Sequence, residues 1–306
     1  MTAEPVVERG TSAAAGDGPV LSPAEFGRFQ ALIYREAGIH LADCKQALLS
    51  GRLSRRVREL GLRSYGAYFQ RVADGGDPEE RRRMLEAVCT HETHFFREAA
   101  HWEFLSGDLL PRWRADAAAR RRPRRVRAWS AGCSSGEEPY SLAMTLLDAL
   151  PDEEGWQVEV VATDLSRRVL DQAAAGLWRV EKAAEIPERL RRAYMLRGRG
   201  AQEGRMAAGD EVRRVVRFQQ LNLNDREWAL QGRFDLVFCR NVLIYFDARS
   251  RAGVVGRLLE RLEPGGHLFV GHAESLTQVT PRLRTVLPTV YTHADQAAPA
   301  RRERIA

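Results

Sequence analysis

Apolar residues in the first part of the chain recur at the three- and four-residue steps of amphipathic helices. Phe26, Phe29 and Ile33 share one face of a predicted helix that begins after Ser22 and ends at Gly38. The same spacing predicts a second helix from about residue 45 and shorter helices from about residues 65 and 79. Residues 21–88 are therefore predicted to form a small all-α domain.

From about residue 125 the pattern changes to short apolar strands that alternate with helices. Strands are predicted at Val126–Ser130, Trp156–Thr163, Phe234–Cys239 and His267–Val270. Phe234–Cys239 is almost wholly apolar, which is typical of a central strand in a parallel sheet. This alternation predicts an α/β fold with a doubly wound parallel sheet over residues 125–293.

The remaining segments show neither pattern clearly. Residues 1–20 are predicted to be a disordered leader, and 294–306 a disordered tail. Residues 89–124 are predicted to be a linker and a helix between the two domains. About residues 186–217, arginine and glycine are frequent, which indicates a hairpin or loop excursion from the sheet.

A turn of small residues separates the first predicted strand from the helix after it. Ala131–Gly136 carries little side-chain bulk, so its backbone N–H groups can approach a ligand closely. Glu137 and Glu138 follow, and Pro139 suits the first helical turn. Two carboxylates here oppose a phosphate and favour a ligand with an amine or a sulfonium. Tight turns also use such residues, so a purely structural role stays open.

Polar residues follow the later predicted strands as well. Asp164 ends the second strand, where it can accept hydrogen bonds from ribose hydroxyls or cap the next helix. Asn222 follows a strand near residue 218, and Arg240 with Asn241 follows the apolar strand. Because carboxyl ends of parallel strands meet at one edge, we expect these residues to converge with Ser130–Gly136 on a ligand.

The segment before the sheet places five hydrogen-bonding side chains in a row, at residues 90–94. This indicates a capped turn between domains. His91 and His94 have no third ligand at a familiar metal-site spacing, so no metal site is expected. The four cysteines show neither CxxC spacing nor the density of a disulfide framework, which favours a reducing cytoplasm. No apolar run is long enough to span a membrane, and the N-terminus lacks signal-peptide order.

The formal net charge is +6, and several of the arginines that contribute to it are clustered on one predicted helix. Arg52, Arg55 and Arg56 fall on one face of the second predicted helix, with Arg58 on its flank. Glu59 can relieve part of their mutual repulsion. The face is either simply solvated or a surface for an acidic partner.

Several motifs together resemble the CheR family of chemotaxis receptor methyltransferases. They are the T-x-x-T-x-FFRE segment at Thr90–Glu98, the WSAGCSSGEEPYSLA segment from Trp129 to Ala143, ATDLS at Ala162–Ser166, LNL at Leu221–Leu223 and FCRNVLIYFD at Phe238–Asp247. The resemblance covers nearly everything from Leu21 to Thr292. It implies a Rossmann-like methyltransferase domain with a small inserted β-subdomain at about 186–217, preceded by an all-α substrate-recognition domain.

The resemblance also implies an activity. Such enzymes use S-adenosylmethionine, release S-adenosylhomocysteine, and esterify glutamate side chains of methyl-accepting chemoreceptors. The expected partner is the cytoplasmic helical domain of a receptor, with a receptor C-terminal tail peptide as a further partner of the β-subdomain in some members. We expect a cytoplasmic monomer that binds no nucleic acid and does not insert into a membrane.

The site residues that the resemblance assigns fall into three groups. The expected cofactor-binding residues are His91, Thr93, Arg97, Gly132, Glu137, Glu138, Asp164, Asn222, Leu223, Arg240 and Asn241. Arg97 and Tyr245 are the expected catalytic residues. The expected substrate-binding residues are Arg52, Arg55, Arg56 and Arg58.

Within these groups the roles differ. Glu137, and with it Glu138, would receive the amino group of the cofactor's methionine. Asp164 would bind the ribose, and Asn222 with Leu223 the adenine. This chain differs from the usual family pattern at two positions, His91 and Trp178.

At His91 the family usually has asparagine, and imidazole lacks the paired donor and acceptor of an amide. Trp178 stands where many relatives carry tyrosine, which we interpret as a packing difference. Arg240 and Asn241 match a wall of the family's site.

Two other classes of function stay open: a methyltransferase that acts on nucleic acid, and a non-catalytic cofactor sensor or interaction module.

Overall fold

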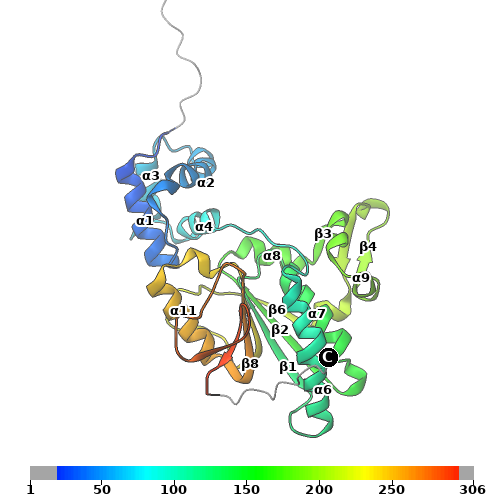
Figure 1. Cartoon of the computed structure of the whole chain (residues 1–306). Helices are drawn as coiled ribbons and strands as arrows, with labels where there is room; N and C mark the ends of the chain where they lie inside the picture. Colours follow the sequence, from blue (N-terminus) through cyan, green and yellow to red (C-terminus); the bar gives the residue numbers. More distant parts are fainter. Residues whose placement is uncertain (1–18, 296–306) are drawn as a thin grey trace, which may run out of the picture. The chain divides into compact units, whose positions relative to one another are not determined.

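The computed structural model describes residues 19–295 and divides the chain into two compact units (Figure 1). The helical unit consists of the chain up to Leu32 together with Ala42–Val88, and the sheet unit of Ile33–Leu41 and the chain from Cys89 on. Nearly all of the predicted leader at 1–20 and most of the predicted tail at 294–306 lie outside the described residues.

The helical unit is built from short helices, as the apolar spacing predicts. They are α1 (Pro23–Ala37), whose last residues belong to the sheet unit, α2 (Gln46–Glu59), α3 (Tyr65–Val72) and α4 (Pro78–Val88). The apolar stripe of α2 is fully buried at Leu49, Leu53 and Val57. Ser64 caps α3, because its hydroxyl accepts a hydrogen bond from the Ala67 N–H at 3.1 Å. The all-α prediction is confirmed.

The sheet unit contains a seven-stranded sheet in the order β6-β2-β1-β7-β8-β10-β9. Its strands are β1 (Arg125–Ala131), β2 (Gln157–Asp164), β6 (Val216–Gln220), β7 (Phe234–Cys239), β8 (Leu262–Val270), β9 (Leu283–Leu287) and β10 (Val290–His293). The first five strands in this order pair in parallel, as predicted, but β10 is antiparallel to both β8 and β9. The sheet is therefore mixed, and it is extended by a hairpin that the sequence reading omitted.

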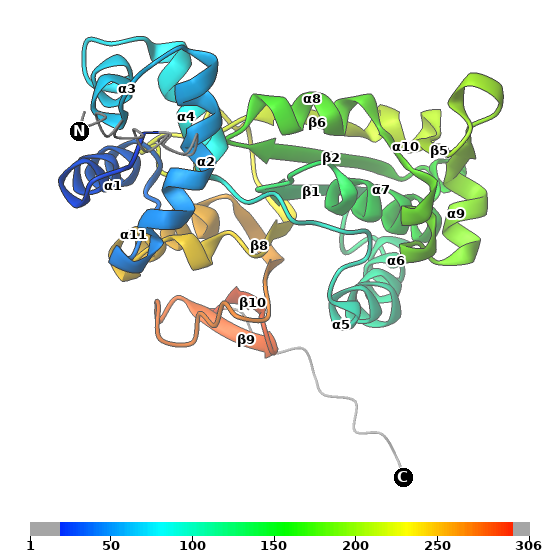
Figure 2. The same cartoon turned by 90° about the horizontal axis from the view of Figure 1, so that it is seen from above.

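Helices cover both faces of this sheet (Figure 2). The helices of the sheet unit are α5 (Ala99–Phe104), α6 (Leu110–Ala118), α7 (Glu137–Ala149), α8 (Arg167–Ala175), α9 (Glu188–Tyr194), α10 (Asp210–Val215) and α11 (Ala248–Glu260), with a π-helical turn at Leu105–Leu109. Alternate residues of β1 enter different cores: Val126 and Ala128 pack with α5, α6 and α7, whereas Trp129 and Ala131 pack with α11. The doubly wound architecture follows from this alternation.

A small antiparallel sheet of order β3-β5-β4 is inserted between α8 and β6. Its strands are β3 (Leu177–Arg179), β4 (Met195–Arg197) and β5 (Arg205–Ala208). The insertion thus begins before the predicted start at about residue 186, and residues 216–217 belong to β6 of the main sheet. Trp178 on β3 packs edge-on against Phe95 at 5.0 Å and Tyr140 at 5.1 Å between ring centroids, which agrees with its interpretation as a packing residue.

Among residues 19–295, no helix is long and apolar enough to cross a membrane.

One buried histidine in the sheet makes the stability of the fold depend on pH. Burial, aided by the charges of Arg112 and Arg284, lowers the pKa of His267 on β8 to about 4. In the unfolded chain a histidine titrates near 6.5, so between pH 6.5 and 4 the unfolded state binds more protons. The contribution of neutral His267 is full above pH 6.5. It is lost as the pH falls toward 4, by about 1.4 kcal/mol per pH unit.

We therefore expect the His267→Gln variant to unfold with a shallower pH dependence than the wild type between pH 6 and 4.5. Denaturant titrations at several pH values measure the free energy of unfolding and its slope against pH. An unchanged slope would contradict this role of His267.

Candidate functional site

The turn after β1 brings backbone N–H groups and small side chains together. Gly132 and Gly136 have φ values of +84° and +99°, which favour glycine. The N–H groups of Gly132 and Cys133 donate to the Thr163 carbonyl of β2, at 2.7 and 2.9 Å. A Cβ atom on Gly132 would lie 2.4 Å from Cγ2 of Val242, so no larger residue fits. The turn therefore requires glycine at position 132.

Asp164 lies at the end of β2 and faces this turn. Its carboxylate accepts hydrogen bonds from the Ser134 N–H at 2.9 Å and the Ser166 N–H at 3.0 Å. Nε2 of His91 lies 3.7 Å from the same carboxylate and has no hydrogen-bond partner among the described residues. Ser166, not Asp164, is the N-cap of α8, because its hydroxyl accepts from the Val169 N–H. Asp164 is therefore not the N-cap residue of α8, although its carboxylate binds the N–H of that residue.

Glu137 opens α7 and binds an ammonium group. Its side chain is only 1% exposed, and Oε1 lies 2.5 Å from Nζ of Lys182. Oε2 accepts a hydrogen bond from the Ser135 hydroxyl at 2.7 Å, and Lys182 also donates to the Thr93 carbonyl at 3.1 Å. A cavity of about 400 Å³ is lined by Glu137, Lys182, Thr93 and His91 among others. These residues fit the amino group of a cationic cofactor, since the same carboxylate already holds an ammonium.

Arg240, at the end of β7, lies buried between two carboxylates. Its guanidinium is 3.2 Å from Oε2 of Glu98 and 3.3 Å from Oε2 of Glu138, and it donates to the Arg97 carbonyl at 2.5 Å. Oε1 of Glu138 accepts from the Ser130 hydroxyl at 2.7 Å. Glu138 therefore contacts Arg240 and Ser130 rather than the lysine that Glu137 binds.

The two carboxylates beside Arg240 titrate differently. Burial raises the pKa of Glu138, although Arg240 opposes this shift. Burial also acts to raise the pKa of Glu98, but the charge of Arg240 and the His272 N–H outweigh it and hold this pKa below its usual range. Glu98 is therefore kept ionised by Arg240 and the His272 N–H.

The loop after Arg240 is held by a buried carboxylate. Glu274 is 1% exposed and accepts hydrogen bonds from the N–H groups of Asn241 at 2.7 Å, Gly271 at 2.6 Å and Ile244 at 3.1 Å. Burial raises the pKa of Glu274. Asn241 itself has a left-handed backbone with φ of +60°. The backbone of the turn that leads to Tyr245 is thus held by the side chain of Glu274.

Three further expected site residues make contacts of their own. Tyr245 is half-buried in the 3-10 turn Leu243–Tyr245, and its carbonyl accepts from the His40 N–H at 2.8 Å. Arg97 donates to the Glu92 carbonyl at 3.1 Å. Asn222 donates to the Glu36 carbonyl at 2.7 Å. Each side chain lies on a loop of the sheet unit.

Leu223 follows Asn222 and is buried. The side-chain oxygen of Asn222 accepts from the Asn224 N–H at 3.0 Å. Both hydrogen-bonding ends of this amide therefore bind the chain itself. An adenine contact at Asn222 would have to share one of them or rely on the backbone and on Leu223.

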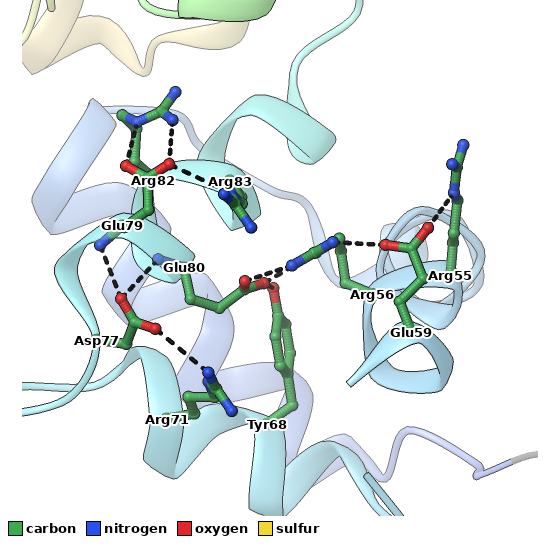
Figure 3. Close-up of polar contacts among 10 residues, drawn as sticks. All are labelled: Arg55, Arg56, Glu59, Tyr68, Arg71, Asp77, Glu79, Glu80, Arg82 and Arg83. Carbon is green, nitrogen blue, oxygen red and sulfur yellow. Dashed lines mark hydrogen bonds and ion pairs between the residues drawn. The ribbon is translucent and has the colours of Figure 1, made fainter. Parts of the chain in front are cut away.

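In the helical unit, the four expected substrate-binding arginines differ in what they contact, and Figure 3 draws two of them, Arg55 and Arg56. Arg56 is 20% exposed and forms a two-point contact with buried Glu80, which also accepts from the Tyr68 hydroxyl at 2.9 Å. The hydrogen bond to Glu80 raises the pKa of Arg56. Arg56 therefore stabilises the helical unit itself.

The other three arginines of this face are placed differently. Arg55 is 81% exposed and pairs with Glu59 at 2.7 Å. Arg58 donates to the Ser54 carbonyl at 3.3 Å, and Arg52 donates to the Val88 carbonyl at the end of α4. Exposed Leu48 lies about one and two turns before Arg52 and Arg55 on the same side of α2. Arg55 and Arg58 are thus the arginines best placed for an external partner.

Sequence reasoning did not single out Glu98, Lys182 or Glu274. Glu98 lies within the Thr90–Glu98 motif, but its left-handed backbone, with φ of +61°, has no local sequence signal. Lys182 and Glu274 come from segments without clear periodicity. The described residues contain no group of three or more His, Cys, Asp and Glu side chains that could hold a metal ion.

A doubly wound sheet, a glycine turn that no larger residue fits and a buried carboxylate that holds an ammonium fit the class of S-adenosylmethionine-dependent methyltransferases. Matches to family models place the chain in one family within this class. Residues 91–292 match the CheR methyltransferase SAM-binding domain, and residues 24–89 match the CheR methyltransferase all-alpha domain. The chain belongs to the CheR methyltransferase family, and its cofactor is S-adenosylmethionine.

Relatives from three bacteria are similar over most of their length. The chain is 38% identical to chemotaxis protein methyltransferase 2 of Pseudomonas aeruginosa over 272 residues, which cover 88% of this chain and 93% of the relative. It is 40% identical to the chemotaxis protein methyltransferase of Klebsiella aerogenes, covering 89% and 90%. It is 39% identical to that of Escherichia coli strain K12, covering 89% and 91%.

Proposed function

We propose that this protein transfers a methyl group from S-adenosylmethionine to glutamate side-chain carboxylates of chemoreceptors, forming glutamate 5-O-methyl esters for sensory adaptation. The observation that carries the proposal is the buried carboxylate of Glu137, which holds an ammonium at the turn after β1. The three relatives are named chemotaxis protein methyltransferases, which supports a chemotaxis protein as the substrate.

The carboxyl edge of the sheet supplies groups for each part of the cofactor. Glu137 would bind the amino group, and Asp164 the ribose hydroxyls. Leu223 would contact the adenine beside Asn222. His91 has an unpartnered ring nitrogen 3.7 Å from Asp164, so it can donate one hydrogen bond to a ligand at this edge. Histidine in place of the usual asparagine is therefore compatible with cofactor binding.

The reaction needs positioning more than acid–base chemistry. When bound, S-adenosylmethionine supplies a methyl group that its sulfonium has already activated. A glutamate side chain has an ordinary pKa of about 4.3 and is ionised at neutral pH, so the protein need not supply a strong base. Holding the carboxylate oxygen in line with the methyl carbon and sulfur can contribute about 7–11 kcal/mol to lowering the barrier. We assign this orientation to Tyr245, and the binding of cofactor carboxylate or substrate charge to Arg97.

Arginines of α2 would bind the acidic surface of a receptor helix. The exposed guanidinium of Arg55 and neighbouring Arg58 fit a partner rich in glutamate. Leu48 adds an apolar contact on the same side of the helix. We exclude Arg56 from the test of this surface, because its loss would leave buried Glu80 without its cation.

We expect the double variant Arg55→Glu and Arg58→Glu to methylate receptor with kcat/KM lowered roughly tenfold, because charge reversal slows association with an acidic partner. Rising salt should lower the wild-type rate in the same way. Methylation rates at several salt concentrations, with calorimetric cofactor affinity alongside, measure both effects. Arg83→Glu is the matched control, since Arg83 also pairs with a glutamate one helical turn away, at 3.2 Å. Salt-insensitive methylation would contradict the proposal.

Further parts of the proposal concern location and partners. We expect the protein to act in the cytoplasm as a monomer. The small sheet has short edge strands, β3 and β4, with exposed Leu177 and Leu196. An extended receptor tail peptide could add to such an edge by main-chain hydrogen bonds.

The decisive assay uses tritiated S-adenosylmethionine and a receptor cytoplasmic fragment. We expect label to enter the fragment and to leave it as methanol after base treatment, because a carboxylate methyl ester is labile to base. Label that resists base, or that enters nucleic acid instead, would favour a different methyltransferase class. Cofactor binding without any transfer would favour a sensor or interaction module.

A further inference from the structure

The chain contains only two lysines, Lys45 and Lys182, among 47 basic residues of the Lys and Arg type. Lys45 is exposed. Lys182 lies in the segment Val180–Glu185 of the inserted subdomain and reaches Glu137 at the turn after β1. One of these two lysines thus forms an ion pair with a deeply buried carboxylate.

The geometry around Lys182 is that of a bound primary ammonium. Nζ lies 2.5 Å from Oε1 of Glu137 and 3.1 Å from the Thr93 carbonyl. The ammonium of lysine and the α-amino group of an amino acid are the same chemical group, with three donors and one positive charge. Arginine has a planar fork instead and could not reproduce these contacts.

We propose that Lys182 is an internal substitute for the cofactor's amino group: it binds Glu137 in the cofactor-free protein and is displaced when the cofactor binds. The inference rests on the proposed role of Glu137 in cofactor binding. Glu137 is 1% exposed, so it needs a cation in both states. Lys182 is 33% exposed and has a flexible stem, so its ammonium can move into solvent.

Displacement of Lys182 sets how tightly an amino-bearing ligand binds. The ligand's amino group can bind Glu137 only by replacing the ammonium of Lys182, which makes a contact of the same kind. The net contribution of this amino group to affinity is therefore small. The inserted subdomain keeps a second tie to the same polar segment, because Glu185 accepts from the Phe95 N–H at 2.8 Å. Lys182 can therefore leave without releasing the subdomain.

A double comparison of protein and ligand tests the displacement. The ligands are S-adenosylhomocysteine and its analogue with hydrogen in place of the α-amino group. The proteins are the wild type and Lys182→Met, with Arg179→Met as the control. Arg179 lines the same cavity but pairs with exposed Glu181. Calorimetric titration measures each dissociation constant, and thermal unfolding checks that each variant is folded.

We expect removal of the ligand's amino group to weaken binding to Lys182→Met by roughly tenfold more than it weakens binding to the wild type. Arg179→Met should behave as the wild type. An equal effect in all three proteins would overturn the displacement and leave the proposed function standing. Weaker binding of both ligands to Lys182→Met would also overturn it, because Lys182 would then hold the ligand's carboxylate. If the wild type binds neither ligand, the proposed cofactor site itself fails.

A second measurement needs no variant, because the two lysines can be followed separately. Trace acetylation followed by mass spectrometry gives the reactivity of Lys182 relative to exposed Lys45. S-adenosylhomocysteine should raise the reactivity of Lys182 several-fold by freeing it from Glu137, and the analogue without an amino group should not. Unchanged or lowered reactivity with S-adenosylhomocysteine would overturn the proposal.

Discussion

Replacing Arg240 with methionine is expected to lower the free energy of unfolding by about 3–5 kcal/mol, the cost of removing one partner from a buried ion pair. Arg240 is the cation that lies between the carboxylates of Glu98 and Glu138, at 3.2 and 3.3 Å. Methionine keeps much of the apolar volume beside Trp102 but supplies no charge. Both carboxylates would then be left in a buried site without a cation.

Denaturant unfolding of wild type and Arg240→Met at neutral pH measures this loss. Arg249→Ala, at an exposed position on α11, should change the free energy of unfolding by no more than about 0.5 kcal/mol. Adding Glu98→Gln and Glu138→Gln to Arg240→Met should recover part of the stability, because the uncompensated charges are removed. Equal stability of wild type and Arg240→Met would contradict the role of Arg240 as the stabilising cation of Glu98 and Glu138.

The Tyr245→Phe variant is expected to reduce kcat of methyl transfer by about 10²-fold, the usual effect of losing one donor that orients a reacting group. Cofactor affinity and stability should stay near those of the wild type. The reason is that Tyr245 is held by its backbone, through the His40 N–H and the Val242 carbonyl. Within residues 19–295 its hydroxyl donates no hydrogen bond that the substitution would break.

Single-turnover methylation, calorimetric affinity for S-adenosylhomocysteine and denaturant unfolding together test this role. Tyr194→Phe on α9 removes a hydroxyl from another half-buried tyrosine and should leave kcat unchanged. A Tyr245→Phe enzyme with wild-type turnover would eliminate the hydroxyl as the orienting group. A parallel loss of affinity and turnover would place Tyr245 in cofactor binding instead.

The sequence predicts the central architecture because local pattern and tertiary role agree there. Val126 and Ala128 alternate with Trp129 in β1, and the structure places these sets in opposite cores. The apolar run Phe234–Cys239 is a central strand. In contrast, β9 is a short edge strand that pairs with short β10. Their pairing depends on a turn at Thr289, which has a positive φ although it is not a glycine, so the sequence gives no signal for this turn.

In the candidate site, too, some features follow from the local sequence and others do not. Glycine at 132 follows from the small-residue turn, but the ion pairs across the fold do not follow from any local pattern. Glu98 and Lys182 reach their partners across long stretches of chain, and Arg56 faces Glu80 on a neighbouring helix. Helical spacing correctly gives Arg56 a place on the arginine face. It cannot show that a buried glutamate engages that guanidinium.

Calorimetric titration with S-adenosylhomocysteine, on the wild type and on Asp164→Ala, tests most directly whether the carboxyl edge of the sheet is the cofactor site. We predict micromolar binding to the wild type and roughly tenfold or greater weakening in Asp164→Ala, since a hydrogen-bonding charged group is lost. Far-UV circular dichroism would confirm that the variant is folded, because Asp164 also binds the Ser134 and Ser166 N–H groups. No binding to the wild type, or equal binding to both proteins, would contradict the account.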